Sequence, residues 1–200
     1  MNERDMLDLL HRRYGQRSSN GGVDAPRFVC AEHVRNRAGF FDRKDGGRTA
    51  DFVAVDTWHG TRHDEPLAVH GVEVKVSRSD WVRELADPAK ASETLEYASH
   101  CWLAVPDASM VRDGELPAGW GLLCPAGIRG LIAKVAPVPR QPEPLTPSAV
   151  AALLRAAVKT AVARERRGVE ADRESQLFDL DPDTDAEPGD GALFGTEEAS

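Results

Sequence analysis

The feature that most constrains the fold is a pair of alternating segments near the middle of the chain. "TADFVAVDTW" (residues 49–58) and "PLAVHGVEVKVS" (residues 66–77) place apolar residues at nearly every second position, and the polar stretch "HGTRHDE" separates them. Period-two alternation is typical of strands, and a short polar connection favours antiparallel pairing. The sequence therefore predicts a β-hairpin over residues 49–77.

The register of this hairpin would gather three charged residues. If its loop is centred near Arg62, residues whose numbers sum to 124 lie opposite one another, so that Asp51 faces Glu73. Lys75, two positions beyond Glu73, shares the same face of the sheet, because side chains alternate along a strand. The valines on either side of Glu73 and Lys75 point to the opposite face, where we expect the core.

Two carboxylates opposed in a sheet repel each other unless a cation neutralises them. Oxygen ligands favour a hard divalent cation, so we predict Mg²⁺ or Mn²⁺ bound by Asp51 and Glu73, with the Val74 carbonyl as a further ligand. Such a cation can polarise a phosphoryl oxygen and lower the pKa of water. Lys75 would position the attacking water and offset developing charge. The alternative is a structural ion-pair cluster on a solvated sheet face.

The remaining segments predict an α/β fold in the order α-β-β-β-α-β, followed by more strands and a helix. Asn2 and Asp5 have capping-box spacing at the start of a helix over about residues 3–13, and Ser77 and Asp80 repeat that relation. We expect strands in residues 27–36, 101–106, 120–127 and 130–138, one or two helices over residues 77–100, and a C-terminal helix over residues 146–168 that ends at Gly168.

Charge divides the chain unevenly. Residues 169–200 hold eleven acids and one base, which gives −10, while residues 1–168 hold 22 acids and 24 bases, which gives +2. The mildly basic body can approach a phosphate backbone. The acidic segment has few aromatic residues, and we expect it to be disordered. The predicted organisation is a domain over residues 1–140, a C-terminal helix over residues 141–168 and a tail over residues 169–200.

These motifs resemble a known family. "TAD", followed 22 residues later by "EVK", resembles the metal-binding and catalytic residues of the PD-(D/E)XK nuclease superfamily, although Ala50 stands where that name has proline. "EVKVSRSDW", "CWLAVP" and "GELPAGWGLL" are similar to the bacterial and phage branch of MmcB-like DNA repair proteins, over about residues 3–137. The resemblance implies a restriction-endonuclease-like αβββαβ core with a mixed sheet flanked by helices. It also implies an Mg²⁺-dependent deoxyribonuclease that acts in DNA repair or recombination.

Further site residues follow from this resemblance. A further acid often assists in such nucleases, for which Glu32 is the candidate and Glu3 the rival. Ser77, Arg78 and Lys90 are candidate contacts to DNA phosphates. Each has an ordinary alternative: Glu32 as a surface acid, Ser77 as a helix cap, and the two basic residues as solvated helix charges.

The expected partner is DNA, and the tail suggests a second one. "ESQLFDLD" is loosely similar to the motif with which repair and replication proteins bind the sliding clamp, through Gln176, Leu177, Phe178 and Leu180. A tail that only solubilises is the alternative. A non-catalytic DNA-binding or adaptor module on the same fold is the rival to an enzyme. The charged N-terminus, the lack of an 18-residue apolar run and three widely spaced cysteines lead us to expect a cytoplasmic protein.

Overall fold

The computed structural model describes residues 1–15, 26–35, 49–57, 67–86 and 95–178, with side chains described as far as Ala171. This part of the chain has an α/β architecture with a six-stranded mixed sheet. Its helices and strands are α1 (Glu3–Tyr14), β1 (Phe28–Arg35), β2 (Thr49–Asp56), β3 (Val69–Val74), α2 (Arg78–Leu85), β4 (His100–Ala104), η2 (Ala108–Met110), β5 (Gly121–Pro125), η3 (Gly127–Arg129), β6 (Leu131–Val135) and α4 (Pro147–Phe178).

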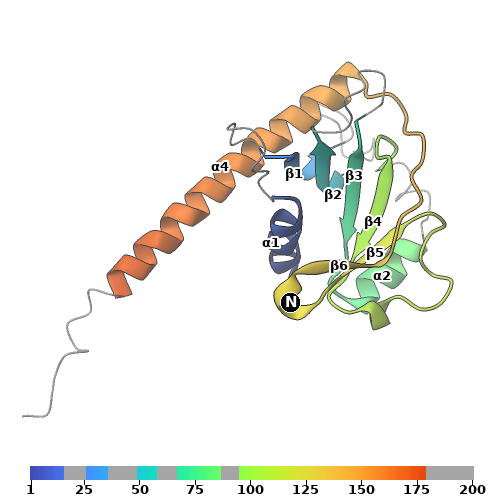
Figure 1. The fold of residues 1–200 in the computed structure, drawn as a ribbon, viewed down its shortest axis with the longest axis horizontal. Coiled ribbons are helices and arrows are strands. Elements are labelled where there is room, and N and C mark those ends of the chain that lie inside the picture. The colour runs from blue at the N-terminus through green and yellow to red at the C-terminus, as the bar shows by residue number, and fades with distance from the viewer. Residues whose placement is uncertain (16–25, 36–48, 58–66, 87–94, 179–200) are drawn as a thin grey trace, which may run out of the picture. The chain divides into compact units, whose positions relative to one another are not determined.

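The strands lie side by side in sequence order, from β1 to β6. β1, β2 and β3 are antiparallel neighbours, β4 and β5 continue the sheet in parallel with β3, and β6 returns antiparallel to β5. The parallel step from β3 to β4 follows a crossover that contains α2, as parallel pairing requires. The predicted α-β-β-β-α-β order, the last pair of strands and the C-terminal helix are therefore confirmed (Figure 1).

The predicted hairpin register is also confirmed. Phe52 pairs with Val72 and Val55 with Val69, so the paired residue numbers sum to 124, as predicted. The ladder ends at Phe52 and Val72, and Asp51 and Glu73 are the next residues beyond this last pair. The connection between the two strands, with the predicted loop centre at Arg62, lies outside the described residues.

Helices cover both faces of the sheet. On one face, α1 buries Met6, Leu7 and Leu10 against residues such as Phe52 and Val72. On the other face, Trp81 of α2 and Ala156 of α4 belong to a second buried cluster. Figure 1 shows α1 and α2 on opposite sides of the sheet. The sheet thus has two apolar faces, and any charged side chain on it must be paired or open to solvent.

Local sequence explains how these helices begin. Asn2 and Asp5 form the predicted capping box, because each side chain accepts a hydrogen bond from the other residue's backbone N–H. The Ser77 hydroxyl accepts from the backbone N–H of Asp80 at 3.2 Å and so caps α2. Both caps satisfy N–H groups that a helix start otherwise leaves without partners.

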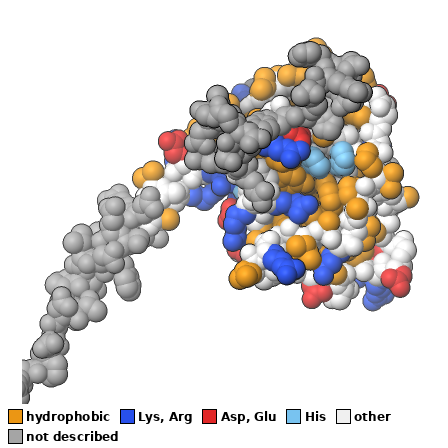
Figure 2. All heavy atoms as spheres, in the orientation of Figure 1, with side chains coloured by type: hydrophobic (Ala, Val, Ile, Leu, Met, Phe, Trp, Pro, Cys, Tyr) orange, Lys and Arg blue, Asp and Glu red, His pale blue; other side chains and the backbone are white. Residues whose placement is uncertain are grey.

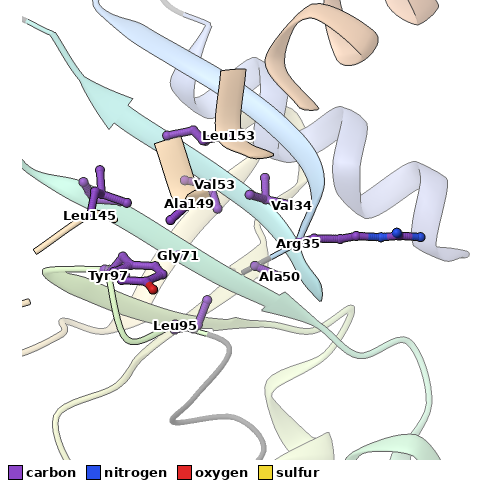
Figure 3. Close-up of a pocket in the computed structure, with 12 residues that line it drawn as sticks. Val34, Arg35, Ala50, Val53, Gly71, Leu95, Tyr97, Leu145, Ala149 and Leu153 are labelled. Carbon is purple, nitrogen blue, oxygen red and sulfur yellow. The ribbon is translucent and has the colours of Figure 1, made fainter. Parts of the chain in front are cut away.

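Glycine at position 71 allows a close approach in the core. A Cβ atom there would lie 2.6 Å from the Leu95 Cδ2 and 3.0 Å from the Ala98 Cβ, closer than carbon atoms can pack. The segment before β4 therefore sits against β3 only because this strand position has no side chain. Nearby, the first turns of α4 leave a small apolar cavity of about 40 Å³ against the sheet, lined by residues that include Val53, Gly71, Leu95, Ala149 and Leu153 (Figure 3).

The helix α4 continues past its predicted end. It passes through Gly168 to Phe178, so the prediction that it ends at residue 168 is wrong, and residues 169–178 are helical rather than disordered. One glycine costs only about 1 kcal/mol relative to alanine inside a helix, and the neighbouring Arg, Glu and Ala residues favour helix. Residues 179–200 lie outside the described part, and so does Leu180, whereas Gln176, Leu177 and Phe178 belong to the last turn of α4.

The chain forms two compact units, Met1–Val162 and Ala163–Ser200, and the boundary between them falls within α4. Within the first unit, the Glu32 N–H donates to the Thr160 Oγ1 of α4 at 2.9 Å. The edge strand β1 is thereby covered by a helix, which protects its backbone from pairing with another chain. Among the described helices, none combines the length and the apolar character needed to cross a membrane.

Candidate active site

The three predicted charged residues come together at one end of the central strands. Asp51 lies on β2, Glu73 on β3 and Lys75 just beyond β3. Residues of both α1 and α2 border this end of the sheet. The Lys75 Nζ lies 2.5 Å from the Glu73 Oε1. The Asp51 Oδ2 accepts a hydrogen bond from the Val74 N–H at 2.8 Å, which fixes its carboxylate across the ladder.

This end of the sheet borders an open cavity of about 270 Å³. Asp51, Val74 and Lys75 line it from the sheet, Glu3 lines it from the first turn of α1, and Glu84 lines it from α2. Glu84 is buried, and its Oε2 lies 3.4 Å from the Lys75 Nζ. Lys75 is therefore held between two carboxylates, one from β3 and one from α2.

Glu32, the first candidate for the assisting acid, does not join this cluster. It pairs with Phe52 across β1 and β2, so its side chain projects from the α1 face, opposite to that of Asp51. Its carboxylate accepts two hydrogen bonds at 2.7 Å from Arg4 and lies 2.7 Å from the His11 Nε2. Burial opposes ionisation there, but Arg4 and His11 together hold the pKa of Glu32 well below its usual range. The structure corrects that candidate: Glu32 anchors α1 to the sheet.

Glu3, the rival acid, lies at the site instead. Its carboxylate, the His33 imidazole and the Asp51 carboxylate each offer an atom within 4.8 Å of the others. The capping box sets the first turn of α1 and so directs Glu3 toward the sheet end. Of the two acids that the sequence left open, only Glu3 borders the cavity with Asp51.

Two residues at the site escaped sequence reasoning. His33 lies opposite Asp51 on β1 with a φ of 50°, a conformation that non-glycine residues rarely adopt and that is often found at functional sites. Glu84 sits on the buried side of α2, one turn beyond Trp81. An acid among the core-facing positions of a helix was the signal that could have identified Glu84.

The electrostatics of the cluster reflect carboxylates buried close together. Burial raises the pKa of Asp51. Burial, together with the charge of Asp51, raises the pKa of Glu73 to about 7. Burial alone would lower the pKa of Lys75, but the carboxylates of Glu73, Asp51 and Glu84 outweigh it and raise that pKa. At neutral pH the Lys75 ammonium therefore stays charged. Asp51 and Glu73 do not both ionise fully, because the nearby positive charge does not offset their burial.

The predicted DNA contacts are engaged within the fold. The Ser77 hydroxyl donates to the Asp80 Oδ2 at 2.6 Å in addition to capping α2. The Arg78 guanidinium binds the carboxylate of Glu115 and the carbonyl of Met110. Ser77 and Arg78 therefore make structural contacts, and Ser77 is the helix cap given as its alternative role. Lys90 lies outside the described residues.

The donor set suits a hard divalent cation. Asp51, Glu3 and His33 offer ligand atoms within 4.8 Å of one another, and Val74 borders the same cavity. Glu73 adds a carboxylate close enough for the charge of Asp51 to act on its pKa. The raised pKa values of Asp51 and Glu73 show that the cluster would gain from added positive charge. The residues therefore fit Mg²⁺ or Mn²⁺.

Comparison with known proteins assigns no family to this chain. No family model matches it, and a search of the curated proteins finds none that matches.

Proposed function

We propose that this protein is a metal-dependent deoxyribonuclease with a restriction-endonuclease-like core, similar to MmcB-like DNA repair proteins. The observation that carries the proposal is the cluster of Asp51, Glu73 and Lys75: the Asp51 carboxylate is held by the Val74 N–H at 2.8 Å, and the Lys75 ammonium lies 2.5 Å from the Glu73 carboxylate. The α-β-β-β-α-β element order around these residues supports it.

In this proposal Asp51 and Glu73 hold Mg²⁺ or Mn²⁺, with Glu3 and the Val74 carbonyl as further candidate ligands. When bound, the cation would polarise a phosphoryl oxygen and activate a water for attack on the phosphodiester. The chain supplies the positioning: the Val74 N–H fixes the Asp51 carboxylate at 2.8 Å.

Lys75 acts through its retained proton. Its raised pKa keeps the ammonium charged, so it can donate a hydrogen bond to the attacking water and offset the negative charge that builds on the phosphate. Glu84, 3.4 Å from the Lys75 Nζ, restrains that side chain from the α2 side. We regard Glu84 as a positioning residue for Lys75.

Incubation with single-stranded, duplex and branched DNA tests the proposal, with Mg²⁺, Mn²⁺ or EDTA present. The wild type is compared with Asp51→Ala and Lys75→Ala, and with the matched controls Asp113→Ala and Lys159→Ala, which change exposed residues away from the cavity. We expect cation-dependent cleavage by the wild type and both controls, and a loss of about a hundredfold or more in the two site variants.

Two results would defeat the proposal. Equal cleavage by all five proteins would show that Asp51 and Lys75 take no part in the reaction. DNA binding without cleavage by the wild type, under every cation condition, would favour the non-catalytic DNA-binding or adaptor module instead.

A further inference from the structure

A second cavity, of about 640 Å³, lies at the opposite end of α1 from Glu3. Arg12, Arg13 and Tyr14 of the last turn of α1 line it, whereas none of the proposed catalytic or metal-binding residues does. A helix rises 1.5 Å per residue, so Glu3 and Arg12 are separated by roughly 14 Å along the axis. This cavity is therefore distinct from the acidic one.

The rim of the second cavity is strongly basic. Four arginines line it, namely Arg12, Arg13, Arg27 and Arg129, against the single carboxylate of Asp56. Arg27 pairs with Asp56 at 2.6 Å, and Arg13 donates to the Leu131 carbonyl at 2.9 Å. Arg12 and Arg129 are exposed and form no ion pair with another described residue. The lining therefore holds excess positive charge, and the planar guanidinium group suits phosphate oxygens.

The floor of the cavity is aromatic. Tyr14, Phe28, His70 and Trp102 line it. The rings of His70 and Trp102 are nearly parallel, with centres 6.4 Å apart, and the Trp102 Nε1 donates to the His70 Nδ1 at 3.1 Å. Burial, aided by His100, lowers the pKa of His70 to about 4, so this imidazole is neutral at pH 7. Figure 2 shows His side chains beside an apolar area, with Lys and Arg side chains close to it.

One polar group in this floor lacks a partner. Tyr14 is 4% exposed, and its hydroxyl makes no hydrogen bond with any described residue. Burial raises the pKa of Tyr14 to about 12, so the group is a neutral hydroxyl able to donate. A buried hydroxyl without a partner costs about 1–3 kcal/mol. The nearby Arg13 guanidinium opposes the rise in the pKa of Tyr14 and so acts on this group.

We propose that this cavity binds a nucleotide unit, with the base against the aromatic floor and the phosphate against Arg12 and Arg129. The Arg13 guanidinium lies 5.7 Å from the centre of the Trp102 ring, and Arg27 lies 5.1 Å from that of Phe28. Guanidinium planes and aromatic rings both stack on bases, and a base joined to a phosphate would use the rings and the positive charge together. The unit could come from a free nucleotide or from a single-stranded stretch of DNA. The inference goes beyond the proposed cleavage and does not depend on it.

Binding in EDTA tests this inference without any cleavage. A fluorescein-labelled twelve-residue oligothymidylate is titrated with the full chain and followed by fluorescence anisotropy, and thymidine 5′-monophosphate, thymidine and inorganic phosphate serve as competitors. The variants are Arg12→Ala, Arg129→Ala and Tyr14→Phe, with Arg112→Ala as the control for loss of an exposed arginine beside η2. Thermal unfolding of each variant is measured in parallel.

We expect Arg12→Ala and Arg129→Ala each to weaken binding about tenfold, and Arg112→Ala to change it less than twofold. Tyr14→Phe should change binding less than twofold and should not lower the melting temperature, because it removes a buried hydroxyl that makes no hydrogen bond with the described residues. Competition by thymidine monophosphate would identify a free nucleotide as a sufficient ligand, and failure to compete would restrict the site to a strand.

Three results would overturn the inference: no binding of either the oligonucleotide or the mononucleotide, binding that neither Arg12→Ala nor Arg129→Ala weakens, or inorganic phosphate competing as well as thymidine monophosphate. If the wild type binds as expected but never cleaves DNA, this inference stands and the nuclease proposal fails. If it cleaves DNA but Arg12→Ala and Arg129→Ala bind normally, the reverse holds.

Discussion

The two ends of α1 present opposite chemistry. At its N-terminal end, a cavity is lined by the acids Glu3, Asp51, Asp80 and Glu84 and by the bases Lys75 and Arg83. Lys75 pairs with Glu84 and with the neighbouring Glu73. At its C-terminal end, four arginines surround a single aspartate over an aromatic floor. At the acidic end, burial raises the pKa values of Asp51 and Glu73. At the basic end, His70 is neutral, and the Tyr14 hydroxyl makes no hydrogen bond with the described residues.

The difference indicates a division of labour along one short helix. Carboxylates that share a site gain from a cation, so the acidic end suits chemistry on a phosphate. Guanidinium groups and aromatic rings suit binding of a phosphate and a base, so the basic end suits recognition. Variants at the two ends should therefore affect cleavage and binding separately.

The largest expected effect separates cleavage from binding. Asp51→Asn should lower the cleavage rate by about a hundredfold to a thousandfold, because it removes a charged ligand from the acidic end. The same variant should bind oligothymidylate in EDTA within twofold of the wild type, since Asp51 does not line the basic cavity. Cleavage rates and anisotropy titrations measure the two quantities. Loss of both together would show that the two ends do not act separately.

The two candidates for the assisting acid, Glu32 and Glu3, should separate stability from activity. Glu32→Gln should lower the free energy of unfolding by about 2 kcal/mol, because it weakens charge-assisted hydrogen bonds to Arg4 and His11. Glu3→Gln should leave stability nearly unchanged, since Glu3 is half-exposed, and should reduce cleavage about tenfold. Urea denaturation and cleavage assays check both variants. A stability loss in Glu3→Gln as large as that in Glu32→Gln would contradict this assignment.

The two ends should respond to pH in opposite directions when no metal is present. The pKa of Glu73 rises from its usual 4.5 to about 7 on folding, so its contribution to stability falls as the pH increases through that window. The pKa of His70 falls from 6.5 to about 4, so its contribution increases with pH between those values.

Melting temperatures measured in EDTA from pH 4.5 to 8 follow this response. We expect shifts of several degrees at most. Relative to the wild type, Glu73→Gln should lose part of the decline with pH, and His70→Phe should lose part of the rise. Superimposable pH profiles for all three proteins would contradict the environments described for both residues.

The smallest effect concerns the start of α2. Ser77→Ala should cost about 1 kcal/mol of stability, because it removes the cap on the Asp80 N–H, and Ser77→Asp should restore most of it. Since the hydroxyl is engaged in the fold, oligothymidylate binding should change little in either variant. Chemical denaturation and anisotropy follow the two properties. Weaker DNA binding by Ser77→Ala at unchanged stability would contradict this and would indicate that Ser77 contacts DNA.

Particular residues show how far the sequence could predict this molecule. Period-two alternation and a symmetric loop position were enough to place Asp51 opposite Glu73, because one register buries the valines of β3. The spacing of Asn2 and Asp5 and of Ser77 and Asp80 likewise located the starts of α1 and α2, although only α1 forms a full capping box. These features depend on neighbours within about 25 residues.

The errors came from longer-range geometry. The side of the sheet that Glu32 faces depends on its register with β2, and a shift of one residue would reverse it. Glu84 approaches Lys75 only because α2 packs on that face, which spacing in the sequence does not specify. The basic cavity combines α1, β1, β2, β3, β4, η3 and β6, so no single motif could predict it.

The most direct test of the central claim is a titration with Mn²⁺ followed by electron paramagnetic resonance at pH 7.5. The wild type should bind Mn²⁺, Asp51→Asn should lose most of that binding, and Glu32→Gln should keep it, because only Asp51 lies on the face of the sheet that holds Glu73. Wild-type protein that binds no Mn²⁺, or an Asp51→Asn variant that binds it as tightly as the wild type, would contradict the account.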